Sequence, residues 1–210
     1  MTKIVALVSQ KGGVGKSTLA RALAREAANS GLDVKVADLD TQQGTFVDWH
    51  RQRLNNGHAR IGSVETYAKA SEALKSGEGY DLLVVDGAAR ASKATLEISK
   101  KADLTILPSC ASRDDLIPAV KLANELAKGG IDRNHMAFAL CRVTTEAETN
   151  DARDFLESAG FRVLAGALVE KPAYRQAQNE GLAVTETRYK TLNQKADELL
   201  TDLTNILLTE

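Results

Sequence analysis

Cysteine, proline and aromatic residues are scarce in this chain of 210 residues, and long apolar runs are missing. The two cysteines, Cys110 and Cys141, do not make the paired framework of a disulfide-stabilised secreted domain. The longest apolar runs, such as 4–8 and 82–85, have the length of a buried strand, whereas a membrane-spanning helix needs roughly 20 apolar residues. We therefore expect neither an integral membrane protein nor a fold held by disulfides.

The chain also lacks an excess of either charge. It has 27 Lys and Arg against 28 Asp and Glu, a net charge of −1 at pH 7. This balance gives no overall attraction to nucleic acid, so any DNA contact requires a local basic patch. Because the opening residues Met-Thr-Lys-Ile show no signal-peptide pattern, we expect a cytoplasmic location.

Short apolar runs alternate with segments of helical periodicity, which indicates βαβ units around a parallel sheet. We predict strands at 3–9, 34–39, 81–85, 104–107, 136–142 and 163–168, with a weaker strand at 61–66. Helices are predicted at 17–29, 116–127, 151–158 and 192–208, with a short one through Ala70 and Leu74. At about 150 residues per domain, the length favours a single domain over residues 1–210. The expected fold class is α/β, a doubly wound, mostly parallel sheet with helices on both faces.

The most informative segment joins the first predicted strand to the first predicted helix. Glycines in such a loop let backbone N–H groups converge on phosphate oxygens, and the N-terminus of the following helix attracts the anion. Lys16 is then expected to reach the β- and γ-phosphates, and the Ser17 hydroxyl to ligate Mg²⁺. The residues expected to bind the nucleotide here are Gly12, Gly13, Val14, Gly15, Lys16, Ser17 and Thr18.

Two predicted strands end in carboxylates. Asp38 and Asp40 lie at the end of one strand, and Asp86 followed by Gly87 closes the other. Neighbouring parallel strands end at one crevice, so Asp40 and Asp86 are expected near the phosphates. An apolar strand closed by a carboxylate is a Walker B pattern, in which Asp86 holds Mg²⁺ through water and Gly87 leaves room for the γ-phosphate. The alternative for Asp38 and Asp40 is a role as caps of the following helix.

Gln10 stands where the common P-loop has its first glycine, and Lys11 adds a second lysine. The loop thereby resembles the deviant Walker A motif, K-G-G-x-G-K-[ST], of the ParA/MinD superfamily of ATPases. The resemblance implies a P-loop NTPase fold and a Mg²⁺-dependent ATPase with ATP/ADP and Mg²⁺ as cofactors. It also implies that Lys11 crosses the interface of an ATP-dependent homodimer to the phosphates held by the other subunit. A solvated loop lysine is the alternative.

The segment from Asp38 to Gln42 similarly resembles the family's switch I, usually D-x-D-P-Q, with Thr41 in place of the proline. The resemblance implies that Asp40 positions or activates the attacking water and that Asp38 is structural or a more remote contact to Mg²⁺. The predicted catalytic residues are therefore Lys11, Lys16 and Asp40, and the predicted metal-binding residues are Ser17, Asp40 and Asp86.

The likeness extends over nearly the whole chain, particularly to small ParA-type partition ATPases without an N-terminal DNA-binding extension. Ser112 and Asp115 match the segment after strand five, and residues 167–186 match the family's late loop and helix. The resemblance places Arg142 and the loop at Lys171 and Pro172 beside the adenine. Solvated surface cations would explain Arg142 and Lys171 equally well.

The resemblance also implies partners. These are nonspecific DNA bound by the ATP dimer, nucleoid association in that state, and a ParB-like centromere-binding or adaptor protein that stimulates hydrolysis. The candidate DNA contacts are Arg175, Arg188, Lys190 and Lys195, with Arg90 and Lys93 as alternatives. Clustered cations are what a phosphate backbone selects, although a dispersed solvated surface is an equal alternative.

Other polar and apolar groups carry no such signal. His50, His58 and His135 lack ligand spacing, so we expect no metal other than the nucleotide's Mg²⁺. The two cysteines are interpreted as small buried hydrophobes rather than iron–sulfur ligands. Acidic residues on the apolar C-terminal helix argue against a membrane anchor, so we expect no membrane partner.

The predicted function is that of a ParA-like partition ATPase that segregates a plasmid or chromosome region. Three alternatives share the fold: a positioning ATPase for a protein cluster or organelle, a P-loop metabolic ligase or kinase, and a reductase of the iron-protein kind. Turnover that responds to a metabolite would favour the ligase or kinase, and bound iron would favour the reductase.

Overall fold

The computed structural model describes residues 1–41, 44–89 and 92–209. Within these ranges the strands are β1 (Lys3–Ser9), β2 (Val34–Asp38), β3 (Ser63–Thr66), β4 (Leu82–Ala89), β5 (Leu104–Ser109), β6 (Met136–Val143), β7 (Arg162–Val163) and β8 (Leu168–Val169). The helices are α1 (Lys16–Asn29), α2 (Thr45–Asn55), α3 (Ala70–Lys75), α4 (Lys93–Ser99), α5 (Arg113–Lys128), α6 (Glu146–Ser158), α7 (Pro172–Asn179) and α8 (Lys190–Thr209), with a 3-10 turn at Arg133–His135.

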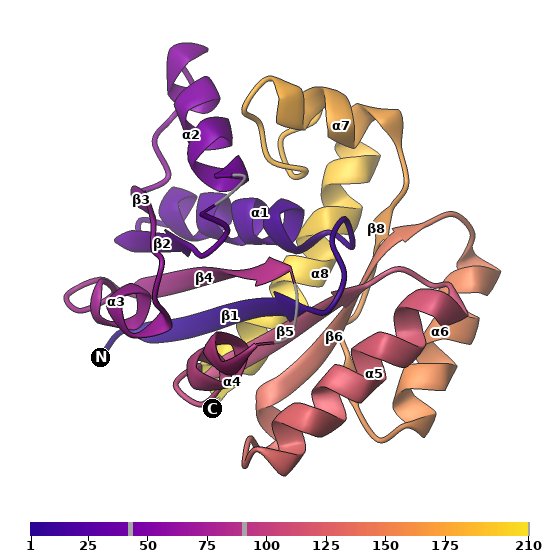
Figure 1. Cartoon of the computed structure of the whole chain (residues 1–210). Helices are drawn as coiled ribbons and strands as arrows, with labels where there is room; N and C mark the ends of the chain where they lie inside the picture. Colours follow the sequence, from indigo (N-terminus) through magenta and orange to yellow (C-terminus); the bar gives the residue numbers. More distant parts are fainter. Residues whose placement is uncertain (42–43, 90–91, 210) are drawn as a thin grey trace.

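The strands form one parallel sheet in the order β3-β2-β4-β1-β5-β6-β7, and β8 pairs with the far end of β6 (Figure 1). The chain leaves β1 for α1 and returns to β2, and later crosses β1 to reach β5. The order therefore reverses beside β1, which is where doubly wound sheets open a crevice at the carboxyl ends of their strands. The predicted fold class is confirmed.

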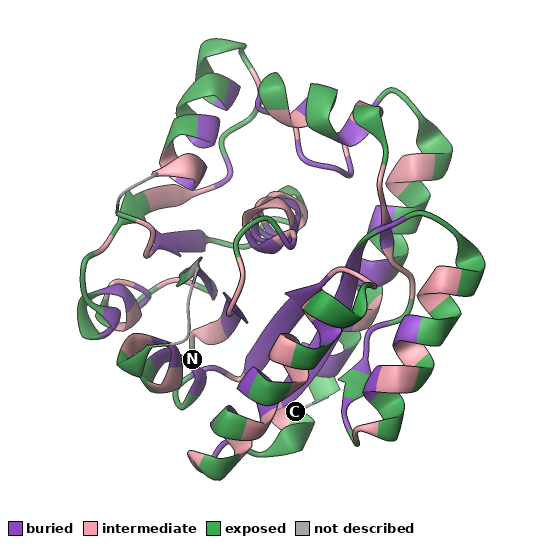
Figure 2. Ribbon diagram, turned by 45° about the vertical axis from the view of Figure 1, so that its right-hand side comes forward, coloured by how far each residue is buried: buried purple, intermediate pink, exposed green. Residues whose placement is uncertain are grey.

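Helices cover both faces of the sheet, because alternate residues of each strand point to opposite sides. Val5 and Leu7 of β1 belong to one apolar cluster with residues of α1, α2, α7 and α8. Ala6 and Val8 belong to a second cluster with residues of α3, α4, α5 and α6. The central strands are accordingly buried, and the exposed residues lie mainly on the outer helix faces and in the loops (Figure 2).

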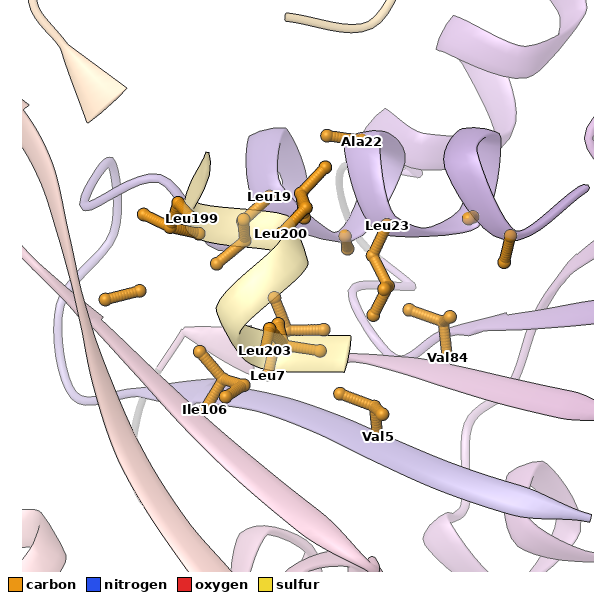
Figure 3. Close-up of a cluster of buried hydrophobic side chains, with 14 of the residues drawn as sticks. Val5, Leu7, Leu19, Ala22, Leu23, Val84, Ile106, Leu199, Leu200 and Leu203 are labelled. Atoms are coloured by element: carbon orange, nitrogen blue, oxygen red, sulfur yellow. The ribbon is translucent and has the colours of Figure 1, made fainter. Parts of the chain in front are cut away.

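The C-terminal helix α8 packs inside the first cluster as predicted. Leu199, Leu200 and Leu203 lie between the underside of α1 and the central strands (Figure 3). Leu199 and Leu203 are fully buried. Burying each such leucine is worth about 2 kcal/mol before entropy is counted, so α8 is a part of the core.

The strand predicted at 163–168 is wrong. Two strands of two residues each, β7 and β8, stand there, separated by a turn at Gly166, whose φ is +71°. Side chains satisfy the backbone between them, because Asp202 accepts a hydrogen bond of 2.8 Å from the Ala165 N–H and Arg153 donates to the carbonyls of Leu164 and Gly166. The sequence shows one apolar run over 163–168. Three backbone groups of residues 164–166, however, hydrogen-bond to side chains of α6 and α8.

Two helices were not predicted, α2 and α4. The buried positions of α2 are Phe46, Trp49, His50 and Arg53, so a charged residue occupies part of its inner face and masks the apolar period. The α4 helix has only seven residues and begins with a capping box formed by Ser92 and Thr95.

Candidate functional site

The glycine loop and the start of α1 form the phosphate-binding geometry that the sequence predicts. Gly13 and Gly15 have φ values of +77° and +103°, which side-chain-bearing residues rarely adopt. Gly15 is the N-cap of α1 and provides no side-chain hydrogen bond, so the first N–H groups of the helix stay available to an anion. A Cβ atom on Gly15 would lie 2.9 Å from the Cβ atom of Cys141, so the loop also packs closely on β6.

A cavity of about 320 Å³ brings most of the predicted nucleotide-binding residues together. Its predicted lining residues are Gly13, Gly15, Lys16, Ser17, Thr18, Arg142 and Lys171. The other predicted residues, Gly12, Val14, Asp86, Gly87 and Pro172, do not line it. Val14 and Asp86 are buried, and Pro172 is the first residue of α7. The structure therefore joins the glycine loop to the loop before α7, as expected for a phosphate-to-base cleft.

Asp86 lies at the bottom of the phosphate region. The residue is 2% exposed, the Ser17 hydroxyl hydrogen-bonds to its carboxylate, and its Oδ1 atom has no hydrogen-bond partner among the described residues. Burial raises the pKa of Asp86 to about 6, although the nearby Lys16 ammonium group opposes the shift. A buried carboxylate oxygen without a partner, beside a hydroxyl, fits a hard divalent cation, so Asp86 and Ser17 are the residues that would hold Mg²⁺.

Gly87 is required for a reason that the sequence did not reveal. The pairing of β1 with β4 shifts register after Leu7 and Asp86. A Cβ atom on Gly87 would lie 2.7 Å from the Leu7 carbonyl oxygen. The glycine thus allows β4 to approach β1 directly after the carboxylate.

Asp38 ties together the segment that carries Asp40. The Asp38 carboxylate is fully buried and accepts hydrogen bonds from the Asp40 N–H at 2.9 Å and from the Phe46 N–H at 3.2 Å. Phe46 lies in the first turn of α2, so Asp38 has the structural role that was predicted and also caps that helix. Burial raises the pKa of Asp38, and the two N–H donors oppose this.

Asp38 and Asp86 are opposite each other in the register of β2 and β4, so both carboxylates end at the same edge of the sheet. Asp40 follows directly after Asp38 and is half-buried. The predicted convergence of the two strand ends at one edge of the sheet is therefore confirmed. The role of Asp40 in activating water stays a prediction.

Lys11 pairs within its own chain. Its ammonium group lies 3.0 Å from Asp115 Oδ1, and the other oxygen of that carboxylate accepts a hydrogen bond of 2.6 Å from the Ser112 hydroxyl. Asp115 lies in the first turn of α5. The predicted contact of Lys11 with a second subunit stays a prediction.

Charged residues close the far end of the cavity. Arg142 donates to Glu170 at 2.8 Å and to the Gly13 carbonyl at 3.1 Å, and Arg175 also pairs with Glu170. Arg142 has a φ of +57°, an uncommon value for a residue with a side chain. Glu170 therefore joins the end of β6, the glycine loop and α7.

Several lining residues were not predicted as nucleotide contacts. They are Cys141, Leu168, Val169, Glu170, Tyr174, Arg175 and Gln178. Proline at the start of a helix, as at Pro172, was the available signal for α7. Which residues of α7 face the cavity depends on how it packs, because α7 contacts α2, which is distant in the sequence, and its Tyr174 hydroxyl donates to the Leu192 carbonyl of α8.

The candidate DNA contacts come from different elements of the chain. Arg175 lines the cavity and pairs with Glu170, whereas Arg188 stacks on Tyr189 with 4.8 Å between the guanidinium carbon and the ring centre. Lys190 begins α8 and Lys195 lies one turn further along it. Lys93 begins α4, and Arg90 lies outside the described residues.

Cys110 and Cys141 are free thiols, half-buried and buried respectively. Burial raises the pKa of Cys141 to about 12, so its thiol is uncharged at neutral pH. In the part of the chain that the structure describes, none of the helices has the length and apolarity needed to cross a bilayer.

Comparison with known proteins agrees with this geometry. The profile of the family described as the CobQ/CobB/MinD/ParA nucleotide binding domain matches residues 5–184. Maintenance of carboxysome distribution protein A from Gloeobacter kilaueensis is 26% identical over 196 residues, which cover 91% of this chain and 88% of that protein.

Solved structures share the fold. The septum site-determining protein MinD of Pyrococcus horikoshii, complexed with Mg-ADP, has a TM-score of 0.76 and 20% identity, with 97% of this chain and 96% of that chain covered. A putative plasmid partition protein of Borrelia burgdorferi, bound to AMPPNP, has a TM-score of 0.76 and 18% identity, with 98% and 99% covered. The profile match spans most of the chain and both halves of the cavity, and the chain belongs to the CobQ/CobB/MinD/ParA family of nucleotide-binding domains.

Proposed function

We propose that the chain is a Mg²⁺-dependent ATPase of the ParA type, which uses an ATP-bound dimer to position a cargo. The observation that carries this proposal is the partnerless oxygen of buried Asp86, which lies beside Ser17 at the start of a helix with free N–H groups. Mg²⁺ bound there would neutralise phosphate charge and polarise the terminal phosphoryl group.

Different residues of the chain bind the phosphates, orient the attacking water and contact the adenine. Lys16, which is 9% exposed, contacts the β- and γ-phosphates, and the N–H groups from Gly12 to Thr18 surround them. Asp40 orients the attacking water from the adjacent strand end. Arg142, Lys171 and Pro172 flank the adenine.

Lys11 makes ATP the link between two subunits. Its ammonium group leaves Asp115 and contacts the phosphates held by the second subunit, so that a cation is added only when both subunits hold nucleotide. Hydrolysis, stimulated by a ParB-like or adaptor partner, removes the γ-phosphate and releases the dimer. The chain therefore alternates between a cytoplasmic form and a nucleoid-associated ATP dimer that binds nonspecific DNA.

The cargo is a plasmid or a chromosome region in the first instance. A second candidate, a protein cluster or organelle, is favoured by one observation, the 26% identity to a carboxysome distribution protein over 91% of the chain. Both cargos use the same ATP-dependent dimer and differ in the partner protein.

The test is ATP turnover and sedimentation of the purified chain with Mg²⁺ and ATP. We expect an ATP-dependent dimer, no dimer with Lys16→Ala or Lys11→Ala, and a long-lived ATP dimer without hydrolysis with Asp40→Ala. Arg51→Ala is the matched control, because Arg51 is exposed and pairs with Asp48 on the outer side of α2. A chain that stays monomeric with ATP, or whose turnover rises with a metabolite and not with DNA and a partner, contradicts the proposal.

A further inference from the structure

Arg21 lies one turn after Ser17 on α1, at the point where three elements of the site meet. One terminal nitrogen donates to the Thr45 carbonyl at 2.6 Å, and the other donates to Gln178 Oε1 at 3.1 Å. Thr45 is the first residue of α2, and Gln178 belongs to α7 and lines the nucleotide cavity. Both helices stand on the same side of the sheet as α1 (Figure 1).

The guanidinium group is also enclosed by rings. Its carbon lies 5.8 Å from the ring centre of Phe46 and 5.2 Å from that of Trp49, two residues of the buried face of α2. The Nε atom is buried without a hydrogen-bond partner, so the side chain is fixed by its two terminal nitrogens and by these rings. Such a buried cation is costly unless its charge is compensated, and Asp38 and Asp86 provide that compensation.

Thr45 is connected to Asp40 by hydrogen bonds of its neighbours. The Asp40 carbonyl accepts a hydrogen bond of 2.9 Å from the Gly44 N–H, and the Asp38 carboxylate accepts hydrogen bonds from the N–H groups of Asp40 and Phe46. Asp38 therefore holds both Asp40 and the first turn of α2 from β2, and Arg21 holds the first residue of α2 from α1.

Gln178 connects this attachment to the nucleotide cavity. Its Oε1 atom accepts hydrogen bonds from both Arg21 and the Thr18 hydroxyl, the latter at 3.1 Å. Thr18 follows the Mg²⁺-binding candidate Ser17, and all three residues Ser17, Thr18 and Gln178 line the cavity. A change in the position of α7 thus reaches Arg21 through one shared acceptor.

We propose that Arg21 is a positioning residue for ATP hydrolysis: it holds the start of α2, and with it Asp40, against α1 and links α2, through Gln178, to the helix that lines the nucleotide cavity. The inference rests on the proposed role of Asp40. Arg21 is not among the residues that line the cavity and acts through Thr45, so its loss alters the chemical step and leaves nucleotide binding intact.

Arg21→Lys tests this directly. Lysine keeps the positive charge near Asp38 and Asp86, but its single nitrogen does not donate to Thr45 and Gln178 in the forked geometry of arginine. We expect kcat to fall by about tenfold or more while KM and the affinity for ATP change by less than about threefold. Arg25→Lys is the matched control on the same helix, because Arg25 pairs with Glu26 and Glu186, and its kcat should stay within about twofold of the wild-type value.

A double-variant cycle distinguishes an effect on the step that involves Asp40 from a nonspecific loss of activity. If Arg21 acts through Asp40, Arg21→Lys should cost little further turnover once Asp40→Asn is present, since both changes disturb one step. Hydrogen exchange at the Asp40 and Phe46 N–H groups should accelerate in Arg21→Lys, and its ATP affinity should persist. Gln178→Met, which removes the shared acceptor, is the second variant and should lower kcat in the same direction by a smaller factor.

Three results would overturn the inference: wild-type kcat in Arg21→Lys, a parallel loss of ATP affinity and turnover, or fully multiplicative losses in the double variant. A lowered melting temperature with unchanged kcat would assign Arg21 to stability alone. If Asp40→Asn itself hydrolyses ATP normally, the proposed role of Asp40 fails, whereas an inactive Asp40→Asn beside an unaffected Arg21→Lys refutes only the inference about Arg21.

Discussion

Lys11 and Asp115 are bound to each other at 3.0 Å, although one lies in the glycine loop and the other in the first turn of α5. The Lys11 side chain is 43% exposed and that of Asp115 is 21% exposed. Attachment to Asp115 lowers the freedom of the ammonium group that is proposed to reach a second subunit. Dimer formation then requires this ion pair to break.

Removing the carboxylate should make dimerisation easier. A partly exposed ion pair contributes about 0–1 kcal/mol, and each dimer breaks two of them, so Asp115→Ala is expected to lower the dissociation constant of the ATP dimer by up to about thirtyfold. Sedimentation velocity at several concentrations measures this. Asp114→Ala removes a neighbouring exposed carboxylate and should leave the dimer equilibrium unchanged. Weaker dimerisation in Asp115→Ala would show that Asp115 supports the interface instead.

Gly15→Ala should abolish nucleotide binding. The alanine Cβ atom would be 2.9 Å from the Cβ atom of Cys141 and would also strain a φ of +103°. Gly31→Ala is a matched control, because Gly31 has a φ of +86° but has open space around its Cβ position. Titration with a fluorescent ATP analogue should show no binding for Gly15→Ala and normal binding for Gly31→Ala, which loses only about 1 kcal/mol of stability. Normal binding by Gly15→Ala would contradict the close packing of the loop on β6.

Magnesium affinity should depend on pH through Asp86. The pKa of its carboxyl is raised from 3.8 to about 6 by burial, and the ion binds the deprotonated form. We expect the Mg²⁺ affinity of the nucleotide complex to fall by up to about tenfold per pH unit below pH 6. Calorimetric titration between pH 5 and 8 measures it, and a flat profile would contradict a role for Asp86 in holding the ion.

The same carboxyl affects the stability of the metal-free chain. Between its unfolded pKa of 3.8 and its folded pKa of about 6, the folded chain binds a proton that the unfolded chain does not, so stability falls as the pH rises through this window. Asp86→Asn removes the charge and should raise the melting temperature at pH 7 by at least roughly 2–4 °C. At pH 4 the two proteins should melt at similar temperatures. A difference that is equal at both pH values would point to packing instead.

Glu186 should be critical for stability although it lies outside the cavity. It accepts hydrogen bonds from both terminal nitrogens of Arg53, at 2.6 and 2.9 Å, and it pairs with Arg25 at 3.0 Å. Arg53 is 2% exposed, so Glu186→Ala would leave a buried cation without its counter-charge. We expect a loss of roughly 3–5 kcal/mol in urea unfolding, against less than about 1 kcal/mol for the exposed Glu180→Ala. A small loss in Glu186→Ala would show that water or Glu26 compensates Arg53.

The sequence predicted the parts of the site that depend on local spacing. Gly15, Lys16 and Ser17 follow β1 directly, and Asp86 closes β4, so the strand-loop-helix pattern and the rule for parallel strand ends were sufficient. The strands at the centre of the sheet were predicted for the same reason, because residues buried on both faces form continuous apolar runs.

Side chains that act through distant contacts escaped prediction. Arg21 occupies an exposed-looking position in an Ala- and Leu-rich helix, and only its contacts with Thr45 and Gln178, 24 and 157 residues away, give it a role. Glu170 likewise acquires its importance from Arg142, 28 residues earlier, and from the Gly13 carbonyl that Arg142 reaches. Such contacts depend on tertiary packing, which no local pattern records.

The position of α8 ties the phosphate cradle to the end of the chain. Leu199 and Leu203 support Leu19 and Leu23 from below, and those two leucines belong to the helix whose first residues receive the anion (Figure 3). A protein shortened before Ala196 would lose the leucines that support that helix while keeping every residue predicted to bind the nucleotide. Proteolytic removal of the C-terminal helix would therefore weaken nucleotide binding although the cleavage lies far from the site. A protein fused at the carboxyl terminus must leave α8 able to pack against the core.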